Sequence, residues 1–261
     1  MGEIVAGRQR PDYGLDAPGT VRSLFLASCI GFIALITGLM GLWSPRHPVA
    51  LLMFPLCYAG PALLVTGLFM IWWSRSGKVR ARERYLDRLP WRGDETVLDI
   101  GCGRGLFLVA AAKRLHRGGK AVGIDLWNAE DLAGNSADGV LANAQLEGVA
   151  DRVEVKTGDA RKLDFADGTF DTVVSSVALH NIEGASERRN AAFEIARVLK
   201  PGGRVLIVDI RHTGEYADVL RGQGVPDARA TRSALSYLAT VLTFGALRAG
   251  VVMGRKTPLP Y

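Results

Sequence analysis

Residues 97–105 read VLDIGCGRG, an apolar strand that runs into a loop with glycine at every second position. Glycines at such spacing permit positive φ angles or a close approach of the backbone to a ligand. The segment GIDLW at 123–127 predicts a second strand that ends in an acid, Asp125, placed to bind the two hydroxyls of a ribose. Together the two segments predict a nucleoside site at the ends of two consecutive strands.

Strands and helices alternate from Gly93 onward. The apolar runs expected to form strands are 97–100, 121–125, 153–157, 172–175 and 204–210. The expected helices are 106–115, 137–147 and 188–199, and a final antiparallel pair of strands is expected at 227–233 and 251–255. This alternation predicts an α/β domain with a Rossmann-like, doubly wound and mostly parallel sheet of seven strands.

Two long apolar segments precede this domain. Ser23–Trp43 is a run of 21 residues without a charge, and Val49–Trp73 is a run of 25 residues without a charge. Each can cross about 30 Å of hydrocarbon as a helix. Because only SPRHP at 44–48 joins them, the pair predicts a transmembrane helical hairpin.

Two other interpretations of the apolar segments have less support. A cleaved signal peptide has a shorter apolar region and is not followed at once by a second span. A buried hairpin of a soluble protein would have to hold Pro55 and Pro61 inside a helix, which a membrane helix tolerates better.

Positive charge flanks the predicted hairpin. Three arginines precede the first segment and six lysines or arginines lie between Arg75 and Arg88, whereas the link holds only Arg46 and His47. This asymmetry predicts that both termini and the α/β domain face the cytoplasm. The basic run predicts a helix at 75–92, directed at the anionic leaflet or forming an ordinary solvated face. The net charge of +6 then needs no nucleic acid to explain it.

We therefore expect four parts in the chain: a loose polar tail at 1–20, two transmembrane helices within 21–74, a basic linker helix at 75–92 and the α/β domain at 93–261. Glycines in the spans permit close helix packing, within the hairpin or in a homodimer. The apolar segment 234–250 fits a core helix or an interfacial helix. Three scattered cysteines indicate neither a disulfide framework nor a Cys-rich metal site, and no metal is expected.

The motifs and their order resemble the class I S-adenosylmethionine-dependent methyltransferases over residues 93 to about 212. The segments that carry the resemblance are ETVLDIGCGRG at 95–105, Asp125, GDA at 158–160, FADGTFDTVVSS at 165–176 and LKPGGRV at 199–205. A nicotinamide enzyme would have glycine three residues after Gly103, where this chain has Leu106. The region 165–205 looks like the quinone and sterol methyltransferases, whose substrates are lipophilic.

The resemblance implies S-adenosylmethionine as the cofactor. Asp99 would lie near the methionyl ammonium, Asp125 would hold the ribose hydroxyls, and Asp159 would bind the adenine amino group. The residues implied to hold the cofactor are Asp99, Gly101, Cys102, Gly103, Asp125, Leu126, Asp159, Ala160 and Ser176.

Methyl transfer requires chiefly that the acceptor is held in line with the methyl group, and a base only where the acceptor retains a proton. His180, in LHNI at 179–182 after the fourth strand, is the first candidate for this base, and His212, after the fifth strand, is the second. Both follow the carboxyl ends of parallel strands, where α/β sheets bind ligands. A structural role is the alternative for each histidine, and Glu183 and Tyr216 are candidate walls of the site.

The sequence therefore predicts a membrane-anchored enzyme that transfers a methyl group from S-adenosylmethionine to a small, lipophilic acceptor at the cytoplasmic membrane face. The alternative is a non-catalytic protein that binds S-adenosylmethionine as a sensor or scaffold at the membrane. Oxygen, sulfur, nitrogen and carbon all stay open as the acceptor atom.

Overall fold

The computed structural model describes residues 10–42, 49–233, 236 and 249–258. These residues divide into two compact units. The hairpin unit comprises Gly14–Arg80 and Asn128–Asn135, and the sheet unit comprises 10–13, Ala81–Trp127 and the described residues from Ser136 onward. The predicted link at 44–48 and most of the apolar segment 234–250 lie outside the described residues.

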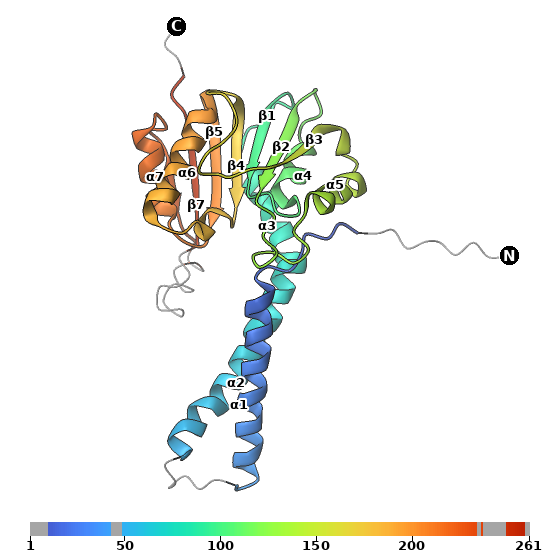
Figure 1. Ribbon diagram of the computed structural model, residues 1–261, viewed down its shortest axis with the longest axis vertical. Coiled ribbons are helices and arrows are strands. Elements are labelled where there is room, and N and C mark those ends of the chain that lie inside the picture. The colour runs from blue at the N-terminus through green and yellow to red at the C-terminus, as the bar shows by residue number, and fades with distance from the viewer. Residues whose placement is uncertain (1–9, 43–48, 234–235, 237–248, 259–261) are drawn as a thin grey trace, which may run out of the picture. The chain divides into compact units, whose positions relative to one another are not determined.

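Two long apolar helices, α1 (Pro18–Leu39) and α2 (Val49–Trp72), make up most of the hairpin unit (Figure 1). Gly31 of α1 and Gly60 of α2 meet where the helices cross, because a Cβ built on Gly31 would lie 2.5 Å from the Cα of Gly60. Such close approach of two backbones requires small residues. These two glycines are therefore accounted for by packing within the hairpin.

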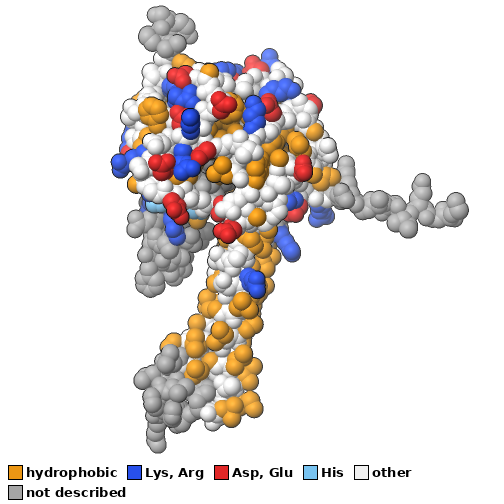
Figure 2. Space-filling model, in the orientation of Figure 1, with side chains coloured by type: hydrophobic (Ala, Val, Ile, Leu, Met, Phe, Trp, Pro, Cys, Tyr) orange, Lys and Arg blue, Asp and Glu red, His pale blue; other side chains and the backbone are white. Residues whose placement is uncertain are grey.

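The face of the hairpin seen in Figure 2 exposes many apolar side chains. Ile33 is 62% exposed and Val65 is 65% exposed, where a core helix of a soluble protein would be covered. Both helices are long and apolar enough to cross a membrane.

The second apolar helix continues beyond its apolar sequence. A π-helical turn, η1 (Trp73–Gly77), leads directly into α3 (Lys78–Leu86). Lys78 is buried and contacts Asp16 at 2.6 Å within the hairpin unit, and Arg82 is buried and contacts Glu147 at 3.3 Å within the sheet unit. The helix expected at 75–92 is thus shorter, continuous with α2, and uses two of its cations for internal ion pairs.

The described residues of the sheet unit form a seven-stranded sheet in the order β3-β2-β1-β4-β5-β7-β6. The strands are β1 (Thr96–Ile100), β2 (Lys120–Asp125), β3 (Val153–Thr157), β4 (Phe170–Ser176), β5 (Leu199–Asp209), β6 (Arg229–Thr231) and β7 (Gly250–Arg255). Neighbours pair in parallel except at β7, which is antiparallel to β5 and to β6. The predicted Rossmann-like, mostly parallel sheet is confirmed.

Helices cover both faces of this sheet (Figure 1). The helices are α4 (Leu106–Ala112), α5 (Ala137–Leu146), α6 (Ala185–Val198) and α7 (Thr213–Gly222), with short 3₁₀ turns η2 (Ala150–Arg152) and η3 (Leu179–Asn181). One core packs α4 and α5 against Val97 and Val174, and the other packs α6 and α7 against Leu98 and Val173. Alternate residues of a strand thus serve opposite cores, as the period of two requires.

The direction of strand order reverses between β1 and β4. From β1 the chain proceeds to β2 and β3 on one side, and from β4 to β5 on the other. In open α/β sheets, ligands bind outside the carboxyl ends of the strands at such a switch point. Ser175 at the end of β4 ties the two strands together here, because its hydroxyl donates a 2.8 Å hydrogen bond to the carbonyl of Ile100.

Three further features differ from expectation. Helix α7 was not predicted, and α1 begins at Pro18 inside the expected loose tail, of which Tyr13 is buried. The strand expected at 204–210 begins five residues earlier, at Leu199, and Phe170 pairs with Leu199 and Thr172 with Arg204. Residues 200–203 therefore form a bulge opposite the single residue 171 of β4. The glycine-rich segment turns within this bulge while β5 continues on both sides of it.

Candidate cofactor and acceptor site

The glycine loop joins β1 to α4 through left-handed backbone. The φ angles of Gly101, Gly103 and Gly105 are 68°, 56° and 83°. A Cβ on Gly101 would collide with the methyl of Ala178, which follows β4. Glycine is required at this position because the loop both turns through positive φ and approaches the neighbouring connection closely.

Asp125 lies at the end of β2 and is bonded to the glycine loop. Its Oδ2 accepts a 2.8 Å hydrogen bond from the amide of Gly103, and its Oδ1 accepts one of 2.7 Å from the amide of Trp127. Carboxylate oxygens can accept more than one hydrogen bond, and a ribose hydroxyl is a suitable donor. The predicted ribose acid and the predicted glycine loop are thus brought together.

Asp99 lies beneath this loop within β1 and is completely buried. Neither of its carboxylate oxygens has a hydrogen-bond partner among the described residues. Burial raises the pKa of Asp99 to about 8; the nearby backbone amide of Leu108 opposes this rise and the negative charge of Asp125 adds to it. A buried carboxyl group without partners calls for a bound donor, preferably a cation.

The two residues of the expected adenine turn follow β3. Asp159 forms a two-pronged contact with Arg161, whose Nε and Nη2 lie 2.9 and 2.6 Å from Oδ2. The hydrogen bond from Arg161 holds the pKa of Asp159 below its usual range. Ala160 packs against the hydrophobic core. Because Asp159 already binds Arg161, a bound ligand would have to share the Asp159 carboxylate with that arginine.

The other predicted contacts differ in their surroundings. Leu126 is 61% exposed beside Asp125, and Ser176 is half-buried at the end of β4. Cys102 is buried with its sulfur against β2, since a Cβ on Gly123 would lie 2.9 Å from that sulfur. Burial raises the pKa of the Cys102 thiol, which therefore stays protonated within the core.

His180 lies in η3 after β4 and is held by Asp209 at the end of β5. The Nδ1 of His180 lies 2.6 Å from Oδ1 of Asp209, and the His180 amide donates a 3.0 Å hydrogen bond to Oδ2. The distance from Nδ1 to Oδ1 is that of an ion pair, but the two groups are not aligned as a hydrogen bond requires. The Asp209 side chain has no exposed surface, and 14% of the His180 side chain is exposed. A buried carboxylate behind a partly open imidazole is an arrangement suited to proton acceptance.

His212 occupies a different position. It precedes α7 in left-handed backbone with a φ of 59°, and its Nδ1 lies 3.8 Å from Glu215. Burial and the nearby Arg188 lower the pKa of His212. Tyr216 is fully buried and cannot form an open wall of a site, although its hydroxyl has no described partner.

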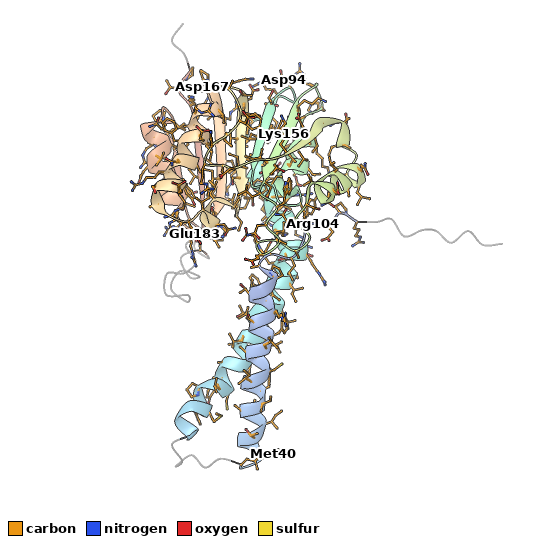
Figure 3. The ribbon with its side chains drawn as sticks, viewed as in Figure 1. Met40, Asp94, Arg104, Lys156, Asp167 and Glu183 are labelled. Carbon is orange, nitrogen blue, oxygen red and sulfur yellow. The ribbon has the colours of Figure 1, made fainter. Side chains whose placement is uncertain are left out.

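Strained backbone marks the carboxyl edge of the sheet. Trp127 after β2, Val177 after β4 and His212 after β5 have φ angles of 62°, 54° and 59° without being glycine. Such conformations cost energy, most of all for a β-branched residue, and concentrate at functional sites. In Figure 3 the labels of Arg104 and Glu183 mark this edge. Asp94 and Asp167 lie at the opposite end of the sheet.

Asp209 is the residue of this site that sequence reasoning missed. It ends the fifth strand in the segment VDIRH, three residues before His212. Its position at the carboxyl end of a parallel strand was the available signal. The sequence alone does not reveal that β4 and β5 are adjacent, and only their adjacency brings Asp209 to His180.

Comparison with known proteins bears on the sheet unit. Residues 98–207 match the family model of a methyltransferase domain. A demethylmenaquinone methyltransferase of Lactiplantibacillus plantarum is 34% identical over 130 residues, which cover 49% of this chain and 50% of that protein. A nocamycin O-methyltransferase of Saccharothrix syringae is 36% identical over 122 residues, which cover 47% of this chain and 40% of that protein.

The fold is also that of solved structures. The crystal structure of the cyclase SpnF superposes with a TM-score of 0.53 at 20% identity, covering 70% of this chain and 82% of that one. This likeness concerns the fold alone, and one fold hosts several chemistries. The chain spans about half the length of the curated relatives it matches. In its motifs, its family match and its sheet order, the segment 98–207 is similar to the S-adenosylmethionine-dependent methyltransferases.

Proposed function

We propose that this protein transfers a methyl group from S-adenosylmethionine to a small, lipophilic acceptor at the cytoplasmic face of a membrane. The observation that carries the proposal is the pair of acids under and beside the glycine loop. Asp99 has a buried carboxyl group that accepts no hydrogen bond from the described residues, and the carboxylate of Asp125 accepts the amides of Gly103 and Trp127 at the loop's edge. This arrangement fits a ligand with an ammonium group at one end and a ribose at the other.

S-adenosylmethionine, when bound, supplies a methyl group on a positively charged sulfur that is already a good leaving group. The protein is then required to hold both reactants and to exclude water. Asp99, beneath the loop, would lie near the ammonium, the amides of the glycine loop would face the methionyl group, and Asp125 would bind the ribose hydroxyls. These assignments follow the positions of the residues relative to the switch point between β1 and β4.

His180 is our candidate for the acceptor side. Its imidazole can take the proton of an acceptor hydroxyl, and the buried carboxylate of Asp209 would stabilise the resulting positive charge. Such a base is needed when the acceptor atom carries a proton that it does not lose by itself. The pair therefore favours an ionisable acceptor such as a phenol or enol.

Apolar side chains support a lipophilic acceptor. Val177 directly after β4 is 44% exposed, and Leu126 directly after β2 is 61% exposed. Both lie at the carboxyl edge on which the predicted site residues converge. The name of the Lactiplantibacillus relative, a demethylmenaquinone methyltransferase, points to the same class of molecule.

The hairpin supplies the argument for the membrane. Its exposed apolar surface would be costly in water and is stable in hydrocarbon (Figure 2). Phe69, Trp72 and Trp73 cluster at one end of α2, with ring centroids 5.7 to 6.4 Å apart. Aromatic rings gather at membrane interfaces, and Arg75 begins the basic segment that the positive-inside rule assigns to the cytoplasm.

Labelled methyl transfer tests the proposed function. Full-length protein in detergent is incubated with methyl-labelled S-adenosylmethionine and a total lipid extract, and the organic phase is counted. We expect organic-phase label that falls at least about tenfold in Asp125→Asn and in His180→Gln, since each removes one required interaction. The matched controls Asp151→Asn and His116→Gln alter exposed residues and should retain transfer.

Two results would contradict the proposal. Full transfer by Asp125→Asn would show that the assigned ribose acid is not used. Tight binding of S-adenosylhomocysteine by a wild-type protein that transfers label to no fraction would favour the sensor or scaffold instead.

A further inference from the structure

A short segment before the first apolar helix is clamped onto the glycine loop. Asp12 contacts Asn143 of α5 through its backbone on both sides: its amide donates to Oδ1 at 2.9 Å, and its carbonyl accepts from Nδ2 at 2.8 Å. Asn143 is 2% exposed, so these bonds are shielded from water. The Asn143 side chain therefore pairs with both backbone groups of Asp12, as a neighbouring strand would in a sheet.

The same asparagine holds the glycine loop. Its Nδ2 also donates a 2.9 Å hydrogen bond to the carbonyl of Arg104, the residue between Gly103 and Gly105. The Arg104 side chain returns to the segment, because its Nε donates a 2.7 Å hydrogen bond to the carbonyl of Asp12. Asp12, Asn143 and Arg104 are thus each hydrogen-bonded to the other two, and one of these bonds holds the carbonyl of Arg104 in the glycine loop.

The next residue locks the segment in place. Tyr13 is buried, its ring lies under the guanidinium of Arg82 at 4.6 Å, and its hydroxyl donates a 3.0 Å hydrogen bond to Glu147. Burial raises the pKa of Tyr13 to about 12, so it remains a donor at physiological pH. An aromatic ring with a satisfied hydroxyl is a strong anchor.

We propose that Asn143 is a positioning residue for the cofactor, and that Asp12–Tyr13 is a clamp that holds the glycine loop in its binding conformation. A loop with three left-handed glycines has many alternative conformations, and fixing one of them before binding raises affinity. Four residues separate the clamp from Pro18, where α1 begins. Cofactor affinity therefore depends on the segment that leads into the first apolar helix.

A second contact of this entering segment is found within the hairpin unit. The amide of Ala17 donates a 3.0 Å hydrogen bond to the carbonyl of Asp131, and the amide of Ala133 donates one of 3.1 Å to the carbonyl of Leu15. The loop that accepts this pairing begins directly after Trp127, two residues beyond Asp125. The segment 12–17 is therefore bonded to loops that follow both β1 and β2.

Binding of S-adenosylhomocysteine to full-length protein in detergent, measured by calorimetry, tests the clamp. We expect about tenfold weaker binding in Asn143→Ala, which loses three hydrogen bonds, and about threefold to fivefold weaker binding in Arg104→Met. Arg117→Met, an exposed arginine outside the clamp, is the matched control and should bind as wild type does. Val252→Ala removes buried volume in the distant β7 and should lower Tm without changing affinity.

Amide hydrogen exchange separates positioning from simple support of the fold. Asn143→Ala should exchange faster at residues 101–105, while Val252→Ala of equal or lower Tm should not. Wild-type affinity in both Asn143→Ala and Arg104→Met would overturn the proposal, as would an equal loss in Val252→Ala. Arg104→Met decides the matter alone if Asn143→Ala does not fold.

The inference rests on the proposed cofactor site, and the two can fail separately. A wild-type protein that does not bind S-adenosylhomocysteine would refute the cofactor site. Unchanged exchange at residues 101–105 in Asn143→Ala would refute the clamp, whatever the wild type binds.

Discussion

At the scale of single residues, the most informative group is the carboxyl of Asp99. It lies inside β1, where neither oxygen accepts a hydrogen bond of normal geometry from the described residues, and burial raises its pKa to about 8 against the opposing effect of the Leu108 amide. The folded protein therefore holds this proton at neutral pH, whereas the unfolded chain has a carboxyl with a pKa near 3.8. A buried carboxyl group without a hydrogen-bond donor lowers the stability of the folded protein and favours the binding of a cation nearby.

The pH dependence of stability should report Asp99 directly. Between about pH 4 and 8 the folded state binds one proton more than the unfolded state, so stability falls as pH rises, by up to about 1.4 kcal/mol per pH unit, and levels off above pH 8. Asp99→Asn has no such proton and should lack this slope. Denaturant unfolding of both proteins across pH 5 to 8.5 measures the difference, and parallel profiles would contradict the assignment.

Asp209 acts through His180 in the proposed reaction, so its removal should affect turnover more than binding. We expect Asp209→Asn to lower kcat about tenfold to hundredfold, since a positioned base contributes about that much or more. The dissociation constant of S-adenosylhomocysteine should change less than about twofold, because Asp209 lies on the acceptor side. Steady-state kinetics and calorimetry on the same preparation check both. Equal losses in kcat and in cofactor affinity would indicate that Asp209 supports the whole edge of the sheet.

At the scale of elements, the crossing of α1 and α2 depends on glycine at one point and not at another. Gly31 touches the backbone of Gly60, whereas a Cβ on Gly19 of the same helix would meet nothing within 4 Å. In helices alanine is favoured over glycine by about 1 kcal/mol. The two positions should therefore respond to the same substitution with opposite signs.

Gly31→Ala should destabilise the hairpin, because the added methyl must push two backbones apart. Gly19→Ala should leave stability unchanged or raise it by up to about 1 kcal/mol through helix propensity. Thermal loss of helicity in detergent, followed by circular dichroism, compares the two variants with wild type. A Gly31→Ala protein as stable as Gly19→Ala would show that the helices do not cross as described.

At the scale of the whole molecule, the proposed topology places both termini and the sheet unit on the cytoplasmic side. This follows from the arginines and lysines that flank the two spans and from the single arginine in the link. The end of the hairpin near Met40 would then lie on the opposite side of the membrane. Met40 is 68% exposed, and Asp167 in the sheet unit is 82% exposed, so both positions can be labelled.

Cysteine labelling measures this topology. In a chain whose native cysteines are replaced, a membrane-impermeant thiol reagent should label Met40→Cys in intact bacterial cells and Asp167→Cys only in inverted vesicles. The reverse pattern would invert the topology. Labelling of both sites in intact cells, or of both only in inverted vesicles, would show that the hairpin does not span the membrane.

Much of the fold is legible in the sequence because it depends on local patterns. The glycine loop, the acid of Asp125, the alternating strands and helices and the final antiparallel pair are all properties of short segments, and the structure has each of them. The two apolar helices are equally legible, since length and absence of charge are local properties. The unpredicted α7 follows His212, in a stretch where no strong periodic pattern was recognised.

Other features depend on contacts between distant segments, and only the tertiary structure decided them. The pairing of His180 with Asp209 requires that β4 and β5 lie side by side, and the clamp joins Asp12 to Asn143 across 131 positions of sequence. Neither contact leaves a periodic or compositional trace. The sequence by itself therefore determined the class of fold, the glycine loop with its acid, and the apolar hairpin, because local patterns specify them; the cofactor followed from the resemblance that those motifs carry. The folded chain decided which acid stands behind the histidine and what holds the glycine loop, because those depend on which segments become neighbours.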